Sequence, residues 1–459
     1  MKKYIALSAI TIGLLSSVNV QAAEDLSSMF SEGKASGQIR AFYIDREYQG
    51  GSGADTHRNS MALGGHVKFV TAEYKGLSLG SALYTTNDIA GFVGYGNGGE
   101  QDPSLLGTGK ESYSILGEAY INYDMSSLGT KTSVKLGYQR YDTPMMGSDD
   151  ARMLPNTFEA YKLTNKDIAG VNFQLAHVNS IAYGTFSNIY GGGILAATAG
   201  YPVSGNAGTG KYHNLGQATV GENTNGVTNF LVSFKNKNFN VKLSNDYAWD
   251  LYNTIYAEAG AKWNCLLTDS VKPFFSVQAI KQNSVGDEKM KNLANSNNGE
   301  IDSLYYAAKF GIKYSGLVAY VAYSETSSND ASDKMNNKYK NAIISQFGGM
   351  PAYTQGMVTR HQFLAGTKTS KIAASYNFKN MGADVSATAY YASFEMDENS
   401  GYGVARTATE PGFDIKYNPA MVKNLNLRLR GNFPRDFAER TTGNDTGWNE
   451  YRFIANYSF

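Results

Sequence analysis

The sequence predicts an all-β protein, a transmembrane antiparallel β-barrel of about 18 strands with short turns at one end and long loops at the other. Three observations predict it. Apolar and polar residues alternate along almost the whole chain, short and long connections follow one another in turn, and the last residues form an aromatic strand. No apolar run of about 18 residues follows residue 23, which excludes a bundle of membrane-spanning helices.

Composition excludes one further class of protein. Of the 459 residues, 41 are Lys or Arg and 40 are Asp or Glu, which gives a formal charge of +1. Nucleic-acid binding depends on a basic excess that neutralises phosphates, so no nucleic-acid partner is expected. Cys265 is the only cysteine, so an exported chain of this length is held together without an internal disulfide.

The N-terminus resembles a secretory signal. Lys2 and Lys3 precede an apolar stretch at 4–15, and Val20-Gln21-Ala22 has the short side chains that a signal peptidase reads. An anchor helix is the alternative, but an apolar core of about 12 residues is too short to span a bilayer. We therefore expect a signal peptide at 1–22, removed after Ala22, and a single barrel domain at 23–459.

The alternation is clearest near the C-terminus. Leu425, Leu427 and Leu429 fall on one face of an extended strand, and Arg428 and Arg430 fall on the other. One face suits hydrocarbon and the other suits water. A soluble β-sandwich also alternates, so the alternation alone does not decide between the two folds.

The spacing of the connections decides between them. Short connections alternate with long ones, apart from a short one near Leu251 on the long-loop side. An even number of strands with both chain ends on the short-turn side is typical of a bacterial outer-membrane barrel, in which the long loops, 182–225 and 327–366 among them, face outward. The expected strands begin near residues 37, 61, 76, 112, 130, 156, 167, 226, 239, 253, 271, 302, 316, 367, 382, 410, 424 and 448.

Aromatic residues support the same location. The final stretch from Tyr451 to Phe459 carries apolar or aromatic residues at its odd positions and ends on Phe. We interpret Phe459 as an assembly signal, which implies the barrel assembly machinery and outer-membrane lipids as partners; a homotrimer is left open. Other aromatics near the short-turn ends suit a girdle at the headgroups: Tyr74, Tyr123, Phe234, Phe239, Trp263, Tyr314, Phe378 and Tyr417.

Catalysis finds no support in the local motifs. None of the five histidines lies near a nucleophile motif, at metal-ligand spacing from a second histidine, or beside the cysteine. We therefore predict no catalytic residue, no metal and no cofactor. A catalytic constellation assembled only in space stays open.

Positive charge is concentrated on strands that become neighbours when the barrel closes. By the alternation, several cations on the first strand and the last two strands point inward, where carboxylates could exchange from one guanidinium to the next. Taken separately, each is an ordinary solvated residue of the lumen. The predicted basic ladder consists of Arg40, Arg46, Arg428, Arg430 and Arg452, extended by Lys416 on the preceding strand.

The third long connection, at 142–155, carries the opposing charge. A barrel of about eighteen strands is wide, so a selective pore needs a loop folded inward. This Met- and Pro-containing loop is apolar enough to pack inside, with Asp149 and Asp150 facing the basic wall; an exposed surface loop is the alternative. The predicted constriction residues are Asp142, Pro144, Asp149, Asp150, Arg152 and Pro155.

Two segments resemble a known family. Residues 37–46 look like the first strand of the OprD-type outer-membrane porins, and 142–144 with 150–159 look like their inward loop and the strand after it. The resemblance implies eighteen strands, a constriction loop and an arginine ladder that conducts small carboxylate-bearing molecules. Residues 327–366, with Asp330, Asp333, Tyr339 and Tyr353, match no pattern of the family, so the acidic side of the pore stays open.

Together these patterns predict an outer-membrane porin of a Gram-negative bacterium. It would let small hydrophilic solutes diffuse passively and with partial selectivity, with amino acids, short peptides or organic acids as the carboxylate-bearing class. A general diffusion pore and a barrel that acts as an adhesin or receptor through its long loops are the alternatives.

Overall fold

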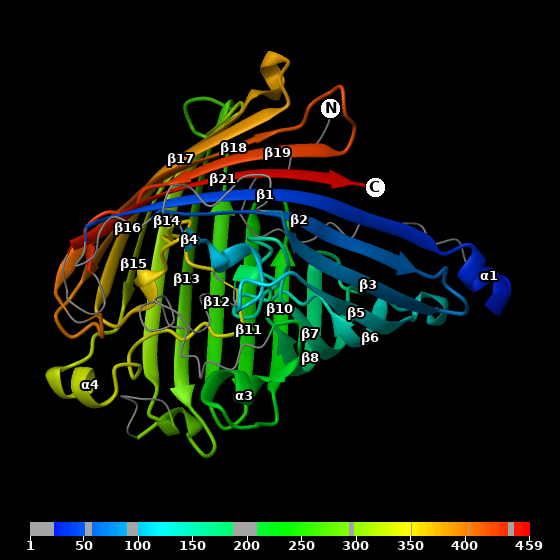
Figure 1. Ribbon diagram of the computed structural model, residues 1–459, viewed down its shortest axis with the longest axis horizontal. Coiled ribbons are helices and arrows are strands. Elements are labelled where there is room, and N and C mark those ends of the chain that lie inside the picture. Colours follow the sequence, from blue (N-terminus) through cyan, green and yellow to red (C-terminus); the bar gives the residue numbers. More distant parts are fainter. Residues whose placement is uncertain are drawn as a thin grey trace.

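The computed structural model describes residues 23–50, 57–89, 100–186, 209–292, 298–349, 351–402, 404–438 and 445–459, so the predicted signal peptide lies outside it. One antiparallel sheet closes on itself (Figure 1). The closure is made where β1 (Lys34–Gly50) pairs with both β2 (His57–Val70) and β21 (Asp445–Ser458). The predicted eighteen-stranded antiparallel barrel is confirmed.

Each barrel strand begins within four residues of its predicted start. Between β2 and β21 the wall consists of β3 (Leu77–Asp88), β5 (Tyr113–Asp124), β6 (Thr132–Gln139), β7 (Thr157–Asn165), β8 (Val171–Ala182), β10 (Val227–Lys235), β11 (Phe239–Ala248), β12 (Tyr252–Lys262), β13 (Val271–Ser284), β14 (Asp302–Tyr314), β15 (Leu317–Thr326), β16 (Thr367–Asn377), β17 (Val385–Met396), β18 (Arg406–Tyr417) and β19 (Leu425–Asn432).

Smaller elements lie in the connections. They are the short strands β4 (Glu100–Gln101), β9 (His213–Asn214) and β20 (Phe437–Ala438), the helices α1 (Leu26–Ser31), α3 (Leu215–Val220) and α4 (Ala331–Asn336), and 3-10 turns at Pro103–Leu105, Ser126–Leu128, Lys289–Asn292, His361–Phe363 and Phe378–Met381. Among the described residues, no helix has both the length and the apolar character needed to cross a membrane.

The two faces of the wall differ as the alternation predicts. Ile255 is 50% exposed on the outer surface, whereas its neighbour Tyr256 is fully buried inside. Outward apolar side chains face hydrocarbon in an outer-membrane barrel. Of the predicted girdle aromatics, six are exposed and three are half-buried; the exposed ones are Phe234, Phe239, Trp263, Tyr314, Tyr417 and Phe459, and the half-buried ones are Tyr74, Tyr123 and Phe378.

The interior is filled by connections rather than by strands alone. In the 142–155 loop, Met145 and Met146 are buried, and the Met146 backbone forms a parallel bridge with Phe347 of the 327–366 loop. The two loops therefore meet inside the barrel.

The 327–366 loop was expected on the long-loop side of the barrel, and the structure adds that residues 342–349 and 358–366 of this loop are buried. Glu410 on β18 explains part of the inward packing of this loop. Its carboxylate accepts the backbone N–H groups of Met357 at 2.6 Å, Val358 at 3.2 Å and Thr359 at 2.9 Å. Backbone donors drawn out of water need such partners, so the loop is fixed to the inner wall.

Candidate pore-lining site

The closure of the barrel brings the predicted cations together. In the register of β19, β21 and β1, Arg430 lies opposite Arg452, and Arg46 lies opposite Glu450. The flanking residues Leu429 and Tyr451 are exposed on the outer surface. The alternation therefore directs these cations to the inner face.

Three of the arginines share buried carboxylates. One oxygen of Glu450 lies 2.8 Å from Arg46 Nη2, and the other lies 3.1 Å from Arg152 Nη2 and 2.9 Å from Arg452 Nε. Asp102 lies 2.9 Å from Arg46 Nη1. We call these five residues, all 5% exposed or less in their side chains, the seam network.

The seam network differs from the exposed ladder that the sequence suggests. Burying a guanidinium is unfavourable unless an acid pairs with it, and here the acids come from two places. Glu450 lies on the last strand, and Asp102 lies in the connection between β3 and β5. Arg46 and Arg452 are therefore ion-paired on the inner side of the wall. The side chain of Arg152 reaches the same carboxylate from the 142–155 loop.

Arg40 attaches the 142–155 loop to the wall. Its Nη1 donates to Asp150 Oδ1 at 2.6 Å and to the backbone carbonyls of Arg152 and Met153 at 2.5 and 3.2 Å. Burial would raise the pKa of Asp150, but Arg40 and Arg140 outweigh it and hold the pKa at about 2. Asp150 therefore stays ionised and faces the basic wall.

The remaining residues predicted in this loop shape it. Asp142 accepts the backbone N–H of Ser148 at 2.8 Å, and Pro144 and Pro155 are buried. Asp149 turns to the 327–366 loop, where its Oδ1 accepts the backbone N–H of Gly349 at 3.3 Å. The two aspartates thus have different partners, one on the wall and one on the second loop.

Three cations of the predicted ladder lie outside the seam network and the Arg40 contact. We call them the open strip: Lys416, Arg428 and Arg430. Arg428 is 26% exposed and forms a bidentate pair with Asp414, at 2.7 Å from Nε and 2.5 Å from Nη2. Arg430 Nε lies 3.9 Å from the same carboxylate. Lys416 lies directly opposite Arg428 in the register. Asp414 is therefore shared by Arg428 and Arg430, and Lys416 has no carboxylate oxygen within 4.0 Å among the described residues.

The sequence analysis missed a set of inward lysines that lie over aromatic rings. Lys309 Nζ is 3.9 Å from the ring centroid of Tyr353, and Lys371 Nζ is 4.8 Å from that of Tyr390. Both lysines lie next to outward apolar residues in the sequence. Because side chains alternate along a strand, the inward position of the lysines could be predicted. The aromatic partner of Lys309 could not, because Tyr353 comes from the 327–366 loop, whereas the partner of Lys371 lies on the adjacent strand β17.

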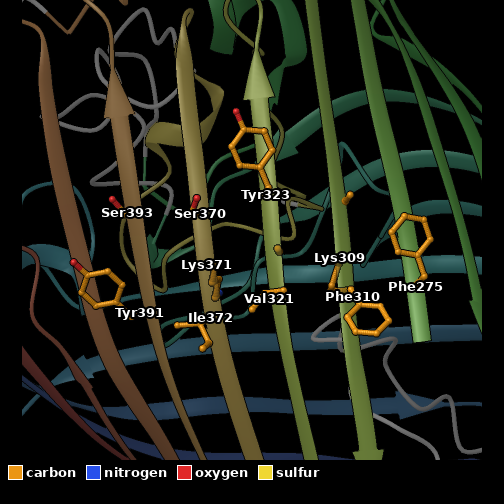
Figure 2. Close-up of a pocket in the computed structure, with 12 residues that line it drawn as sticks. Phe275, Lys309, Phe310, Val321, Tyr323, Ser370, Lys371, Ile372, Tyr391 and Ser393 are labelled. Atoms are coloured by element: carbon orange, nitrogen blue, oxygen red, sulfur yellow. The ribbon is translucent and has the colours of Figure 1, made fainter. Parts of the chain in front are cut away.

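The outer wall carries a groove of about 460 Å³ across β13 to β17 (Figure 2). Figure 2 shows Phe310 on β14, Tyr323 on β15 and Tyr391 on β17, with the small side chains of Ser370 on β16 and Ser393 on β17. The aromatic residues are exposed on the outer surface. This groove therefore faces away from the lumen and is no part of the solute path.

Phe459 lies at the end of the closing strand. Its backbone N–H and carbonyl pair with Gly37 at 3.1 and 3.0 Å, and its ring is about half exposed. The terminal residue therefore lies at the seam, with its ring on the outer surface.

Comparisons with known proteins bear on the fold and the family of this chain. A search of the curated proteins found no match to the sequence. Among solved structures, Pseudomonas aeruginosa OccK9 (OpdG) is 18% identical with a TM-score of 0.72, OpdK with vanillate is 14% identical with 0.69, and OccK2 (OpdF) in complex with glucuronate is 13% identical with 0.68, all three from that organism. Each alignment covers 94% of this chain and 99% of the other.

These structures show the fold, an outer-membrane barrel. The family is shown by a match of residues 28–459 to the model of the OprD family of outer membrane porins. The chain belongs to the OprD family, and it is an outer-membrane porin of a Gram-negative bacterium.

Proposed function

We propose that this porin passes small carboxylate-bearing solutes selectively, through a lumen narrowed by the 142–155 and 327–366 loops. The open strip carries the proposal. Lys416, Arg428 and Arg430 line one side of the lumen with Asp414 as their only carboxylate within 4.0 Å among the described residues. The excess positive charge attracts anions, and guanidinium groups suit carboxylates.

Two solved relatives support the solute class. OpdK was solved with vanillate and OccK2 (OpdF) with glucuronate, and both of these ligands carry a carboxylate. The two proteins are 14% and 13% identical to this chain, so the support extends to the class of solute and not to one compound.

The narrowing follows from the two inner loops. Arg40 holds Asp150 at one side of the interior, and the Met146–Phe347 bridge joins the loops. Asp150 contacts Arg40 at 2.6 Å and lies 3.7 Å from Arg140, so the 142–155 loop is held against the wall by an ion pair. The lumen is thus narrowed beside a wall that carries cations, which favours a carboxylate solute over an apolar one.

A planar-bilayer recording tests the proposal. The parent protein is expected to prefer Cl⁻ over K⁺ in a salt gradient, and Arg428→Gln with Arg430→Gln should shift the zero-current potential toward cation preference. The shift should shrink between about 0.1 M and 1 M salt, because the screening length falls from about 10 Å to 3 Å.

Lys281→Gln is the matched control, since Lys281 pairs with the exposed Asp302 near the long-loop end of β13 and lies in outward register. It should leave the potential unchanged. Equal slowing of carboxylate and neutral-sugar uptake by the two arginine substitutions would instead identify a general diffusion pore.

A further inference from the structure

Two lysines face each other on the inner surface, several strands away from the seam. Lys135 on β6 and Lys162 on β7 are direct partners in the antiparallel register. Their neighbours Leu136 and Tyr161 are 42% and 45% exposed on the outer surface, so both lysines point inward. Like charges directly opposite one another destabilise a sheet unless nearby groups offset the repulsion.

No acid neutralises the pair. Among the described residues, neither ammonium group has a carboxylate oxygen within 4.0 Å, and the nearby acids are engaged elsewhere. Glu118 is held by Lys68 at 2.6 Å and by the hydroxyl of Tyr84 at 2.8 Å. Asp142 accepts both the backbone N–H and the hydroxyl of Ser148. Neither lysine therefore forms a contact ion pair with these acids, and the ammonium donors remain available to a solute.

Aromatic rings stabilise the two ammonium groups without neutralising them. Lys135 Nζ lies 4.1 Å from the ring centroid of Tyr120, and Lys162 Nζ lies 6.0 Å from that of Tyr141. A ring face attracts a cation but removes none of its charge. Each ammonium has three N–H donors, so donors remain for an anion.

The position of the pair suits a solute that has passed the constriction. The 142–155 loop leaves the wall directly after β6, and Lys135 lies four residues from the end of that strand, toward the short turns. Tyr141, at the root of the loop, lies over Lys162. Both lysines are half-buried rather than enclosed, as contact with the lumen requires.

We propose that Lys135 and Lys162 form a binding site for a carboxylate of the permeating solute, separate from the open strip, and that the pair favours dicarboxylates over monocarboxylates. This inference rests on the proposed function, because it assumes that carboxylates enter the lumen. Two cations on adjacent strands offer donors to two oxygen atoms of one anion, and a dianion gains more from two positive charges than a monoanion does.

Single-channel recordings of the full chain with succinate or acetate test the site. Lys135→Gln and Lys162→Gln should each shorten the mean residence time of succinate about threefold, and the double variant about tenfold, with a smaller effect on acetate. The double variant Lys135→Arg with Lys162→Arg keeps both charges and should retain most of the residence time. Removing like-charge repulsion is not expected to prevent folding, which heat-modifiable migration checks.

Lys272→Gln is the matched control, because Lys272 is another lysine in inward register, opposite Lys313, but it is exposed near the short turns. It removes the same charge where solvent screens it, so the residence time should change little. Equal losses in Lys272→Gln and in the Lys135→Gln and Lys162→Gln double variant would overturn the site in favour of a diffuse charge effect.

The two proposals fail differently. Loss of carboxylate preference in the arginine variants, with unchanged succinate residence in the double lysine variant, would overturn only the lysine site. No carboxylate preference in the parent protein would overturn the proposed function and the lysine site together.

Discussion

Two parts of the inner wall carry inward cations in the same alternating pattern. In one part the cations are ion-paired with acids, and in the other no acid among the described residues pairs with them. At the seam, Arg46, Arg152 and Arg452 share Glu450 and Asp102 and are almost completely buried. On β6 and β7, Lys135 and Lys162 have rings beside them and no carboxylate within 4.0 Å in the described part of the chain. The first group links β1 to β21 and holds the 142–155 loop, whereas the second forms no ion pair with the residues that the structure describes and is half-buried.

The difference shows that an inward position in the alternating pattern does not by itself identify a pore-lining cation. A guanidinium can form several hydrogen bonds at once and suits a buried network with carboxylates. An ammonium group is a compact and strongly hydrated charge, which keeps it near water. The function of each cation therefore depends on which acids the neighbouring strands and loops bring to it.

Removing the shared acid of the seam should have the largest effect. Glu450→Gln leaves three buried guanidinium groups with Asp102 as the main remaining acid. Breaking a buried ion pair costs about 3–5 kcal/mol, so we expect a loss of that size in the free energy of unfolding. Urea unfolding of the protein in detergent micelles measures it.

The control is an acid of the surface. Glu300 lies 3.4 Å from Lys340 and is 44% exposed, so Glu300→Gln should cost less than about 1 kcal/mol. A Glu450→Gln variant as stable as this control would mean that the seam network contributes nothing to closure, and the contrast between the two walls would disappear.

Much of the fold follows from local information in the sequence. The outward position of Ile255 and the inward position of Tyr256 follow from alternation, which a closed sheet requires in every strand. Short turns also fix register: the connection at 418–424 is short, so the pairing of Lys416 with Arg428 can be estimated from the sequence.

The contacts that define the interior depend on distant residues. Lys135 and Lys162 are separated by the 142–155 loop, so no short turn sets their register. The return of the 327–366 loop depends on Glu410, about fifty residues further along, and on the bridge between Met146 and Phe347. Such pairings leave no periodic trace in the sequence, which explains why the inward packing of this loop was not predicted.

A smaller effect is expected where the seam meets the 142–155 loop. Asp150→Asn removes the acid that lies 2.6 Å from Arg40 and 3.7 Å from Arg140. These two arginines then lose the negative charge of this carboxylate, just as Lys135 and Lys162 lack a paired carboxylate within the described ranges. The ratio of anion to cation permeability should rise about twofold. The zero-current potential in a KCl gradient measures it.

Asp302→Asn is the matched control, because Asp302 pairs with Lys281 and lies in outward register, away from the lumen. It should leave the permeability ratio unchanged. A large jump in conductance in Asp150→Asn would contradict the expectation of a purely electrostatic effect, since it would mean that the loop had left the wall.

The smallest effect concerns Asp149, the aspartate that faces the second loop rather than the seam. Burial raises its pKa to about 6, against the opposing influence of Arg360 and the backbone N–H of Gly349. The folded protein therefore binds a proton more tightly than the unfolded chain, whose Asp pKa is about 3.9. The resulting stabilisation is present below about pH 4 and is lost as the pH rises through about 6.

Asp149→Asn removes this dependence, because an amide does not titrate while its oxygen still accepts the N–H of Gly349. The variant should gain thermal stability relative to the parent as the pH is raised from about 4.5 to about 7.5. Asp150→Asn should show no such drift over the same interval, because the pKa of Asp150 is about 2 and the group stays ionised throughout. Parallel melting curves at the two pH values for both variants separate the aspartates, and identical pH dependence would contradict their assignment to different partners.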